Sequence, residues 1–365
     1  MRLSISTNME NKLLDGLVGT NVIQVFGKLS NDYVGGGLES HLLNSKTSSK
    51  EYFEQHVKHV HEKGMTYNYT FNAPSLMNRE YTKEGRKKIR ELLDYICMIG
   101  VDEVTVANYY LMSLILKSYP NLDVKVSATM QVDTIKQCRI FEDMGVSCIV
   151  LDPMKVNRDF QLLEAIRKAV KCDLELIVNN NCLWKCPVLQ PHQTFLGHSS
   201  QSKESTDLNF DYIYVKRCAQ DRVNKPESWL IADWIRPEDL YLYEEIGYDY
   251  FKIIDRATPT DIMIMRAKAY TNRKYEGNLL DLIQHWGYRD IASPSEYIDN
   301  VYIDNRKLDN YVNHFKRKNC ALLECGTECR HCFVYAEKCV NINPDFQLNY
   351  NKNHAILISK SELVE

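Results

Sequence analysis

The stretch CIVLDPMKVNRDFQLLEAIRKAVKCDLELIV, residues 148–178, contains two short apolar runs separated by a longer amphipathic segment. The runs CIVLD (148–152) and LELIV (174–178) have the length and the β-branched content of buried strands. Between them, RDFQLLEAIRKAV (158–170) repeats apolar residues at helical spacing. A strand, a helix and a second strand in this order predict a βα unit, in which a helix joins two parallel strands and covers them.

The same alternation extends in both directions, from the N-terminus to about residue 270. Because no G-x-G-x-x-G follows the first strand, a closed barrel is favoured over an open doubly wound sheet. We therefore predict an α/β fold, a (βα)8 TIM-type barrel, with one candidate strand peripheral or misassigned. The nine candidate strands are LSIST (3–7), VIQVF (22–26), TYNYTF (66–71), EVTVA (103–107), VKVSA (124–128), CIVLD (148–152), LELIV (174–178), WLIAD (229–233) and FKIID (251–255).

The chain divides into a predicted barrel, residues 1–275, and a cysteine-rich C-terminal extension of helical or irregular structure, residues 276–365. Within the barrel, residues 180–228 form a long connection, and the part from 185 onward has little helical periodicity. A loop of this length in a compact domain is more often functional than idle. We expect it to carry a cluster-binding site.

Composition excludes several classes of protein. With 44% hydrophobic and 25% charged residues, the chain has the composition of a globular protein. A formal net charge of -3 gives no global attraction to nucleic acid or to an anionic membrane, although a local basic groove leaves nucleic acid open as a partner. The N-terminus lacks the apolar core of a signal peptide, and no apolar run is long enough for a membrane span. We expect a cytoplasmic protein without a membrane partner.

Seven of the twelve cysteines lie in polar or loop-like surroundings. Cys182 and Cys186 follow the strand LELIV, which places them at the carboxyl-end mouth of a barrel, where functional residues gather. Cys218, in YVKRCAQDR, is flanked by cations that would help to neutralise thiolates. These three residues are predicted to bind a metal cofactor, with His192 or His198 as further candidate ligands.

The extension contains the pattern Cys325-x3-Cys329-x2-Cys332-x6-Cys339. Four cysteines within fifteen residues are a strong signal for a metal, but they suit zinc and an iron-sulfur cluster alike. Two arrangements remain open. The extension either donates a cysteine to complete the first site or forms a site of its own, with zinc as the alternative metal there.

Further polar residues follow the predicted strands and should meet at the same mouth. Arg256 could clamp a carboxylate or a phosphate, and Lys28, Glu39 and His41 lie on and beside the glycine-rich loop YVGGGLESH. We take Glu39, His41 and Arg256 as candidate catalytic residues. The other strand-end residues are Asn8, Asn72, Asn108, Gln131, Asp152, Asn179, Asn180, Asn181 and Asp255.

Several segments, taken in order over residues 1–270, resemble the collagenase-like peptidase family U-32. GVDEVTVANYYL is similar to its "GvDaviVad" segment, LELIVNNNCLWKCP stands where the family has its first cysteine pair, and KRCAQDR resembles "gxCxqxCR". WIRPEDL and FKIIDR resemble "lspkDl" and "slKIeGR"; YTFNAPSLMN, SATMQVDT and FEDMGVSCIVLD also resemble family segments. The resemblance implies a barrel with a cysteine-held [4Fe-4S] cluster.

The sequence departs from the family pattern at the cysteines. Cys182 and Cys186 are separated by three residues instead of six, and Asp221 replaces the second cysteine of the "CxqxCR" piece. A fourth ligand downstream of Cys218 within the barrel is absent. The cysteines of the extension are the natural substitutes, so one [4Fe-4S] cluster is expected and a second is possible in principle.

The resemblance implies two activities, proteolysis and oxygen-independent hydroxylation. Neither G-x-S-x-G nor H-E-x-x-H occurs, so the residues give proteolysis little support. We expect an iron-sulfur-dependent modification enzyme that performs redox or hydroxylation chemistry on a polar substrate, such as an RNA base, a peptide or a small molecule. The alternatives are a U-32-type peptidase and a non-catalytic, cluster-bearing subunit that pairs with a protein of the same family.

Overall fold

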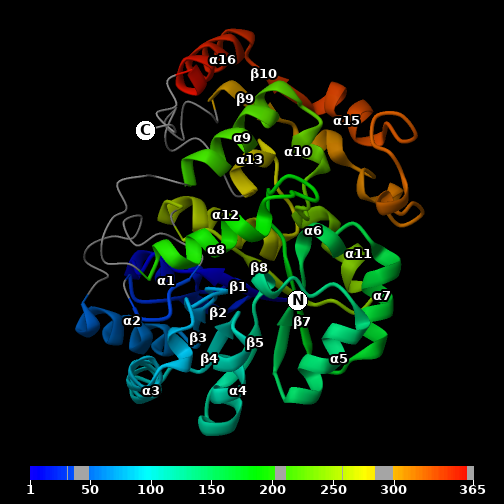
Figure 1. The fold of residues 1–365 in the computed structure, drawn as a ribbon. Helices are drawn as coiled ribbons and strands as arrows, with labels where there is room; N and C mark the ends of the chain where they lie inside the picture. The colour runs from blue at the N-terminus through cyan, green and yellow to red at the C-terminus, as the bar shows by residue number, and fades with distance from the viewer. Residues whose placement is uncertain (31, 37–48, 202–210, 257, 284–298, 360–365) are drawn as a thin grey trace.

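The computed structural model covers the whole chain and describes every residue except 31, 37–48, 202–210, 257, 284–298 and 360–365. Eight parallel strands in the described part close into a barrel, in which each strand pairs with the next and β8 pairs with β1. This confirms the predicted TIM-type barrel (Figure 1). The strands are β1 (Arg2–Ser6), β2 (Val22–Gly27), β3 (Thr66–Phe71), β4 (Glu103–Val106), β5 (Asp123–Val126), β6 (Cys148–Val150), β7 (Asp173–Ile177) and β8 (Tyr250–Ile253).

The ninth candidate strand, WLIAD (229–233), is wrong. Its first residues belong to the short helix α10 (Ser228–Ile231), which packs against other helices outside the barrel. Trp229 and Leu230 are buried there, and the Trp229 indole donates a hydrogen bond to the carbonyl of Arg222 (3.1 Å). The run is apolar because helices cover it. A buried helix and a buried strand give the same short apolar pattern.

Helices cover the outside of the barrel, and a further group lies beyond one end of it (Figure 1). No helix in the described ranges is long and apolar enough to cross a membrane. The helices are α1 (Asn11–Leu17), α2 (Lys50–Glu62), α3 (Lys83–Met98), α4 (Tyr109–Ser118), α5 (Ile135–Met144), α6 (Pro153–Val156), α7 (Phe160–Ala169), α8 (Leu189–Ser199), α9 (Asp211–Asn224), α10, α11 (Leu240–Glu244), α12 (Thr260–Asn272), α13 (Leu279–Leu282), α15 (His331–Cys339) and α16 (Pro344–Ser359).

The long connection predicted after β7 contains the two helices α8 and α9, which the sequence did not indicate. The reason is visible in α9. Its residues Ala219, Arg222 and Val223 are buried, and α8, α10 and α16 all contact it. A helix that is covered on several sides lacks the single apolar stripe by which an amphipathic helix is recognised.

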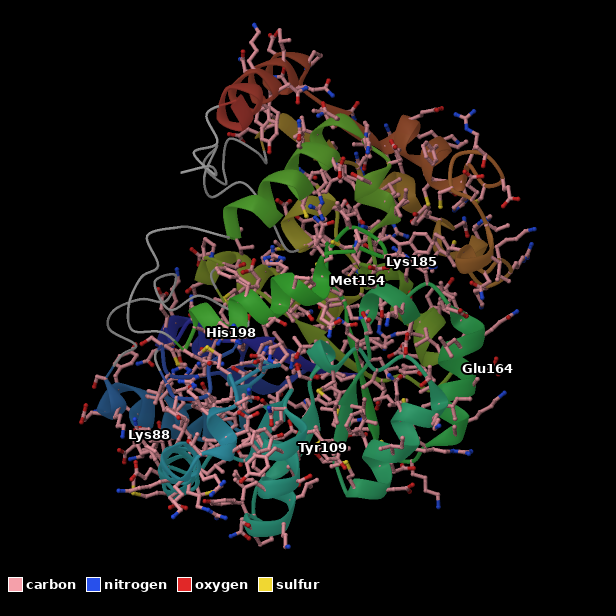
Figure 2. The ribbon with its side chains drawn as sticks, in the orientation of Figure 1. Lys88, Tyr109, Met154, Glu164, Lys185 and His198 are labelled. Atoms are coloured by element: carbon pink, nitrogen blue, oxygen red, sulfur yellow. The ribbon has the colours of Figure 1, made fainter. Side chains whose placement is uncertain are left out.

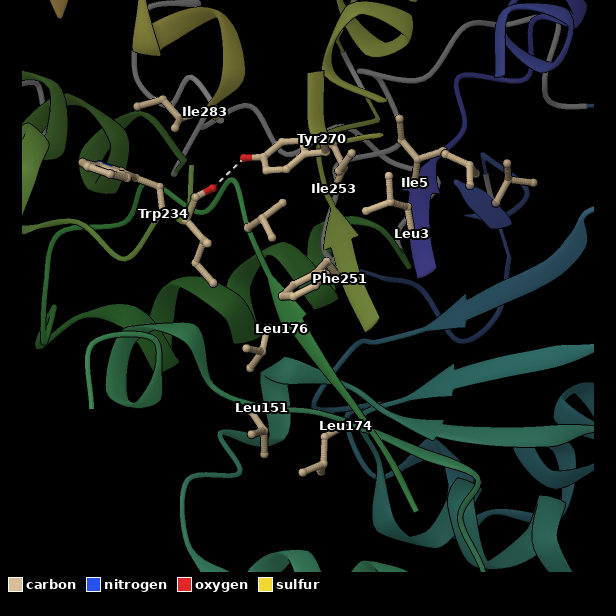
Figure 3. Packing of buried hydrophobic residues seen from close by; sticks show 14 of the residues in the cluster. Leu3, Ile5, Leu151, Leu174, Leu176, Trp234, Phe251, Ile253, Tyr270 and Ile283 are labelled. Carbon is tan, nitrogen blue, oxygen red and sulfur yellow. Dashed lines mark hydrogen bonds between the residues drawn. The ribbon is translucent and has the colours of Figure 1, made fainter. Parts of the chain in front are cut away.

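Residues on the strands alternate between two environments. Leu174 and Leu176 of β7 and Phe251 and Ile253 of β8 belong to the main hydrophobic cluster (Figure 3). Tyr270 of α12 joins the same packing, and its hydroxyl donates to the carbonyl of Ile235 (2.8 Å). The intervening strand positions are polar, as expected when successive side chains point to opposite faces. The barrel interior is therefore unusually polar.

Buried charges in this interior form a network around Lys125. Its ammonium lies 3.1 Å from Glu103 Oε2 and 3.3 Å from Glu175 Oε2, and Lys252 Nζ lies 3.4 Å from Glu175. Burial alone would lower the pKa of Lys125, but the two carboxylates raise it well above its ordinary value. The network reaches Lys252, near the carboxyl end of β8, whose pKa is lowered by burial although Glu175 opposes this.

Lys125→Met is expected to lower the free energy of unfolding by about 3–5 kcal/mol, because it leaves buried carboxylates without their main partner. Lys168→Met is the control, since the Lys168–Glu164 pair is exposed and should contribute at most about 1 kcal/mol. Urea unfolding followed by circular dichroism measures both. Equal stability of the two variants would show that the interior charges do not depend on Lys125.

His56 fixes α2 against the barrel. The imidazole is buried, its Nε2 lies 3.0 Å from Thr7 Oγ1, and its ring meets the edge of the Tyr67 ring. Nδ1 has no hydrogen-bond partner among the described residues. Burial, with a smaller contribution from His59, lowers the pKa of His56 from 6.5 to about 4.

The folded protein therefore binds this proton less readily than the unfolded chain does. The contribution of neutral His56, about 3 kcal/mol, is fully present above pH 6.5 and is lost as the pH falls from 6.5 to about 4. As the pH is lowered across this range, the free energy of unfolding should fall less steeply for His56→Met than for the natural protein. His61→Gln, on the exposed end of the same helix, is the control; identical slopes in all three proteins would contradict the assignment.

Candidate functional site

The carboxyl ends of the barrel strands open onto a cavity of about 220 Å³. Thr70 of β3, Thr105 of β4, Val150 of β6 and Lys252 of β8 contribute to its wall. Phe26, on β2, adds an apolar surface, and its ring lies 3.7 Å from the Lys252 ammonium. The cavity lies where TIM-barrel enzymes have their active sites.

The three cysteines predicted to form the first site all line this cavity. Cys182 and Cys186 lie in the loop after β7, and Cys218 comes from α9. The loop begins at a fixed point, because the Asn179 side chain donates to the carbonyl of Ile254 (2.9 Å) and accepts from its amide (2.8 Å). Thiols from two separate segments thus meet at one mouth.

The buried guanidinium of Arg222 lies beside these thiols. Its Nη1 donates to the carbonyl of Cys218 (3.3 Å), whereas its Nε and Nη2 have no partner among the described residues. Burial raises the pKa of Cys182 and of Cys218, and the charge of Arg222 acts against this rise in both thiols. Arg222 therefore favours the thiolate form that binds a metal.

Another part of the cavity wall is cationic. Arg256 follows β8 and lines the cavity, and its Nη1 lies 3.5 Å from Thr70 Oγ1. A Cβ at Gly36 would come within 2.6 Å of Asn72 Oδ1 and 3.8 Å of Arg256 Nη2, so a larger residue here would have to displace the Asn72 side chain.

Asp255, directly before Arg256, also lines the cavity and has a φ of +99°. A side chain is rare in this backbone region, and strain of this kind gathers at functional sites. The family segment that resembles FKIIDR has a glycine at this position. The chain therefore makes a sharp turn after β8 with Asp255 in place of the glycine. This turn directs Arg256 toward the cavity.

Two of the three candidate catalytic residues, Glu39 and His41, lie outside the described residues. Lys28 does not line the cavity; its ammonium lies 3.0 Å from the buried carboxylate of Asp32. His192 lines the cavity, whereas His198 does not, and its Nε2 lies 3.0 Å from Ser75 Oγ. Of the other predicted strand-end residues, the cavity is lined by Asn72, Asp152, Asn180 and Asp255.

Arg222 was not predicted as a site residue. The signal was present, since Arg222 lies four residues after Cys218 in KRCAQDR, and residues four apart share a helix face. It was missed because no helix was predicted there. Without α9, the spacing between the two residues carries no geometric meaning.

The cysteines of the extension lie in two places. Cys325, Cys329 and Cys332 lie together near Cys320, whereas Cys339 is buried at the end of α15, where its carbonyl accepts from the amide of Asp304 (2.9 Å). In the part of the chain that the structure describes, no group of three or more His, Cys, Asp or Glu side chains is already arranged to hold a metal ion. Metal binding at either set of thiols therefore requires the side chains to turn toward a common point.

Comparison with known proteins gives consistent results. The family model described as peptidase family U32 matches residues 32–275. The uncharacterized protease MJ1657 of Methanocaldococcus jannaschii is 31% identical over 300 residues, which cover 81% of this chain and 84% of that protein.

A solved structure, that of the U32 peptidase Mk0906, matches with a TM-score of 0.52 and 20% identity, covering 70% of this chain and 93% of that one. At this identity the likeness supports the fold alone. The family model spans more than half of the chain, and the relative in Methanocaldococcus jannaschii covers most of it. On these matches, this chain belongs to peptidase family U32.

Proposed function

We propose that this chain is an iron-sulfur-dependent modification enzyme of the U32 type, which acts on a polar substrate at the mouth of the barrel. One observation carries the proposal. The thiols of Cys182, Cys186 and Cys218 line a single cavity, and the buried guanidinium of Arg222 lies beside them with two nitrogens that lack partners among the described residues. A buried cation next to several thiols is what an anionic thiolate cluster needs.

The residues fit a [4Fe-4S] cluster in donor type and in charge. Three cysteines would supply thiolates, and Arg222 would offset part of their negative charge. His192, on the same cavity wall, is the available candidate for a further ligand. When bound, such a cluster supplies one-electron redox chemistry at the place where a substrate would enter.

The chain's own residues would bind and orient the substrate. Arg256 offers a planar, permanently charged fork suited to a carboxylate or a phosphate. Asn72 and Asn180 add amides that can donate and accept, while Phe26 and Leu196 supply apolar walls that exclude water. This combination favours a polar, anion-bearing substrate with a flat or apolar part.

Peptide hydrolysis is the second candidate, because the relatives with functional names are called a protease and a peptidase. The Ser75 hydroxyl lies 3.0 Å from His198 Nε2, the spacing of a nucleophile and its base. Burial lowers the pKa of His198, with a further contribution from Arg79, and this keeps the imidazole neutral. However, neither residue lines the cavity, and Ser75 Oγ accepts a hydrogen bond from the amide of Met77.

Cys182→Ala is expected to lose most of its iron and sulfide, because it removes one of the three thiols that line the cavity. Anaerobic purification followed by iron and sulfide analysis and by electron paramagnetic resonance measures this loss. Cys97→Ala, which removes a half-buried thiol from α3, is the matched control and should keep the full content.

Equal iron and sulfide in Cys182→Ala and Cys97→Ala would refute the mouth cluster, and so would natural protein that contains no iron. Loss of peptide hydrolysis in Ser75→Ala, with iron retained, would favour the second candidate. A cluster-bearing chain that turns over substrate only with another member of its family would assign it the role of a partner subunit.

Arg222→Met should slow the alkylation of Cys218 by iodoacetamide by up to about tenfold in reduced, metal-depleted protein. The physical reason is that loss of the guanidinium raises the thiol pKa, and one pKa unit changes the thiolate fraction about tenfold. Peptide mass spectrometry over a range of pH gives the rates. Arg139→Met, on the exposed face of α5, is the control; if both variants match the natural protein, Arg222 does not act on the thiol.

A further inference from the structure

A second set of thiols, none of which lines the cavity, lies in the extension from the 3-10 turn Cys320–Leu322 to the start of the helix α15. The chain folds back here, so that Cys325 and Cys329 face each other in an isolated parallel bridge. The amide of Gly326 donates to the carbonyl of Cys329 (2.9 Å), and Gly326 has a φ of +98°. The turn depends on glycine and brings the backbones of two cysteines together.

Two of the thiols contact a stack of rings. Cys329 Sγ lies 3.5 Å from His314 Nε2, and Cys332 Sγ lies 3.1 Å from the Tyr311 hydroxyl. The ring of His331 stacks between those of His314 (4.0 Å) and Tyr311 (5.0 Å). The two contacts are at the two ends of one stack, so this stack of rings connects Cys329 to Cys332.

Cys320 is the fourth thiol of the group. It is half-buried in the 3-10 turn Cys320–Leu322 and packs against the hydrophobic core. Burial, together with Cys332, Cys325 and Cys329, raises the pKa of Cys320 to about 12, and the three thiols act on it because they lie close to it. Cys339, which spacing alone would include, has Lys307, Asp304 and Arg236 as its charged neighbours instead.

We propose that Cys320, Cys325, Cys329 and Cys332 bind one structural zinc ion, as a site separate from the mouth. Four thiolates from a segment of thirteen residues form the closed tetrahedral set typical of structural zinc, and the spacings of four, three and two intervening residues are short enough for one ion. His314 would donate a hydrogen bond to the Cys329 thiolate, as outer residues do in such sites.

The local packing explains what a bound zinc ion would do for the structure. Leu322 is 79% exposed and Cys325 is exposed, so this segment buries little apolar surface of its own. A segment with so little core commonly depends on a metal for its folding free energy. The four thiols do not form a ready-made site among the described residues, so the ion would draw them together and tighten the fold-back.

This inference does not rest on the proposed function, and zinc can be present whether or not the mouth carries a cluster. The test compares two cysteine variants of the full chain, Cys320→Ser and Cys339→Ser. The proposed zinc site includes Cys320 and leaves out Cys339, whereas spacing alone would include Cys339. Each is expressed with added Zn²⁺, purified anaerobically and analysed for zinc and iron by mass spectrometry. The natural protein and Cys339→Ser should each carry about one zinc per chain, and Cys320→Ser should carry at least about tenfold less.

Zinc retained in full by Cys320→Ser, or lost from Cys339→Ser, would overturn the assignment. Loss of iron instead of zinc from Cys320→Ser would also overturn it, because the extension would then hold an iron-sulfur centre. Cys182→Ala should keep its zinc, and parallel loss of zinc there would mean that the two sets of thiols share one site.

Two further measurements test the zinc site even if Cys320→Ser fails to fold. Cys325→Ser changes an exposed thiol and should lose zinc while its circular dichroism stays that of the natural protein. In the unmodified protein, a chelator should release the zinc and speed trypsin cleavage at Lys318, just before the site, and at Arg330, between Cys329 and Cys332. Unchanged cleavage after release of the metal would show that the ion does not hold the fold-back, and the structural role would be rejected.

Discussion

A charge buried inside this protein has to lie against an opposite charge, and this requirement organises both the barrel interior and its mouth. In the interior, the ammonium of Lys125 lies between the carboxylates of Glu103 and Glu175. At the mouth, the buried guanidinium of Arg222 has no carboxylate partner among the described residues. The groups beside it that can become anionic include the thiols of Cys182 and Cys218, whose ionisation is also the condition for binding a metal.

Much of the fold could be predicted from the sequence, because the barrel strands are short apolar runs at regular intervals. Eight of the nine predicted runs form β1 to β8. The strand predicted at WLIAD (229–233) was wrong because an apolar run indicates burial and does not indicate the backbone conformation. The helices α8 and α9 were missed for the opposite reason, since burial on several sides removes the pattern that identifies a helix.

The candidate site was predictable where position along a strand decides it, and not where the folding of a loop does. Cys182 and Arg256 could be placed at the mouth because each follows a barrel strand. Spacing grouped Cys339 with the other cysteines of the extension, whereas the zinc site that we propose contains Cys320 in its place, because the other three thiols act on Cys320. The two residues Cys332 and Cys339 lie near opposite ends of α15, seven positions and therefore about 10 Å apart along the helix axis.

The extension also fixes the segments that carry the mouth thiols. The amide side chains of Asn224 on α9 and Asn351 on α16 exchange two hydrogen bonds, of 2.9 and 2.8 Å. Near the loop after β7, the charge of Lys185 acts on Cys325, and Figure 2 shows Lys185 where the barrel meets the cysteine-rich segment. The C-terminal side therefore packs against α9 and lies beside the loop after β7. Long connections in a barrel are mobile unless something packs on them, so the position of α9 depends on an extension whose described residues do not line the cavity.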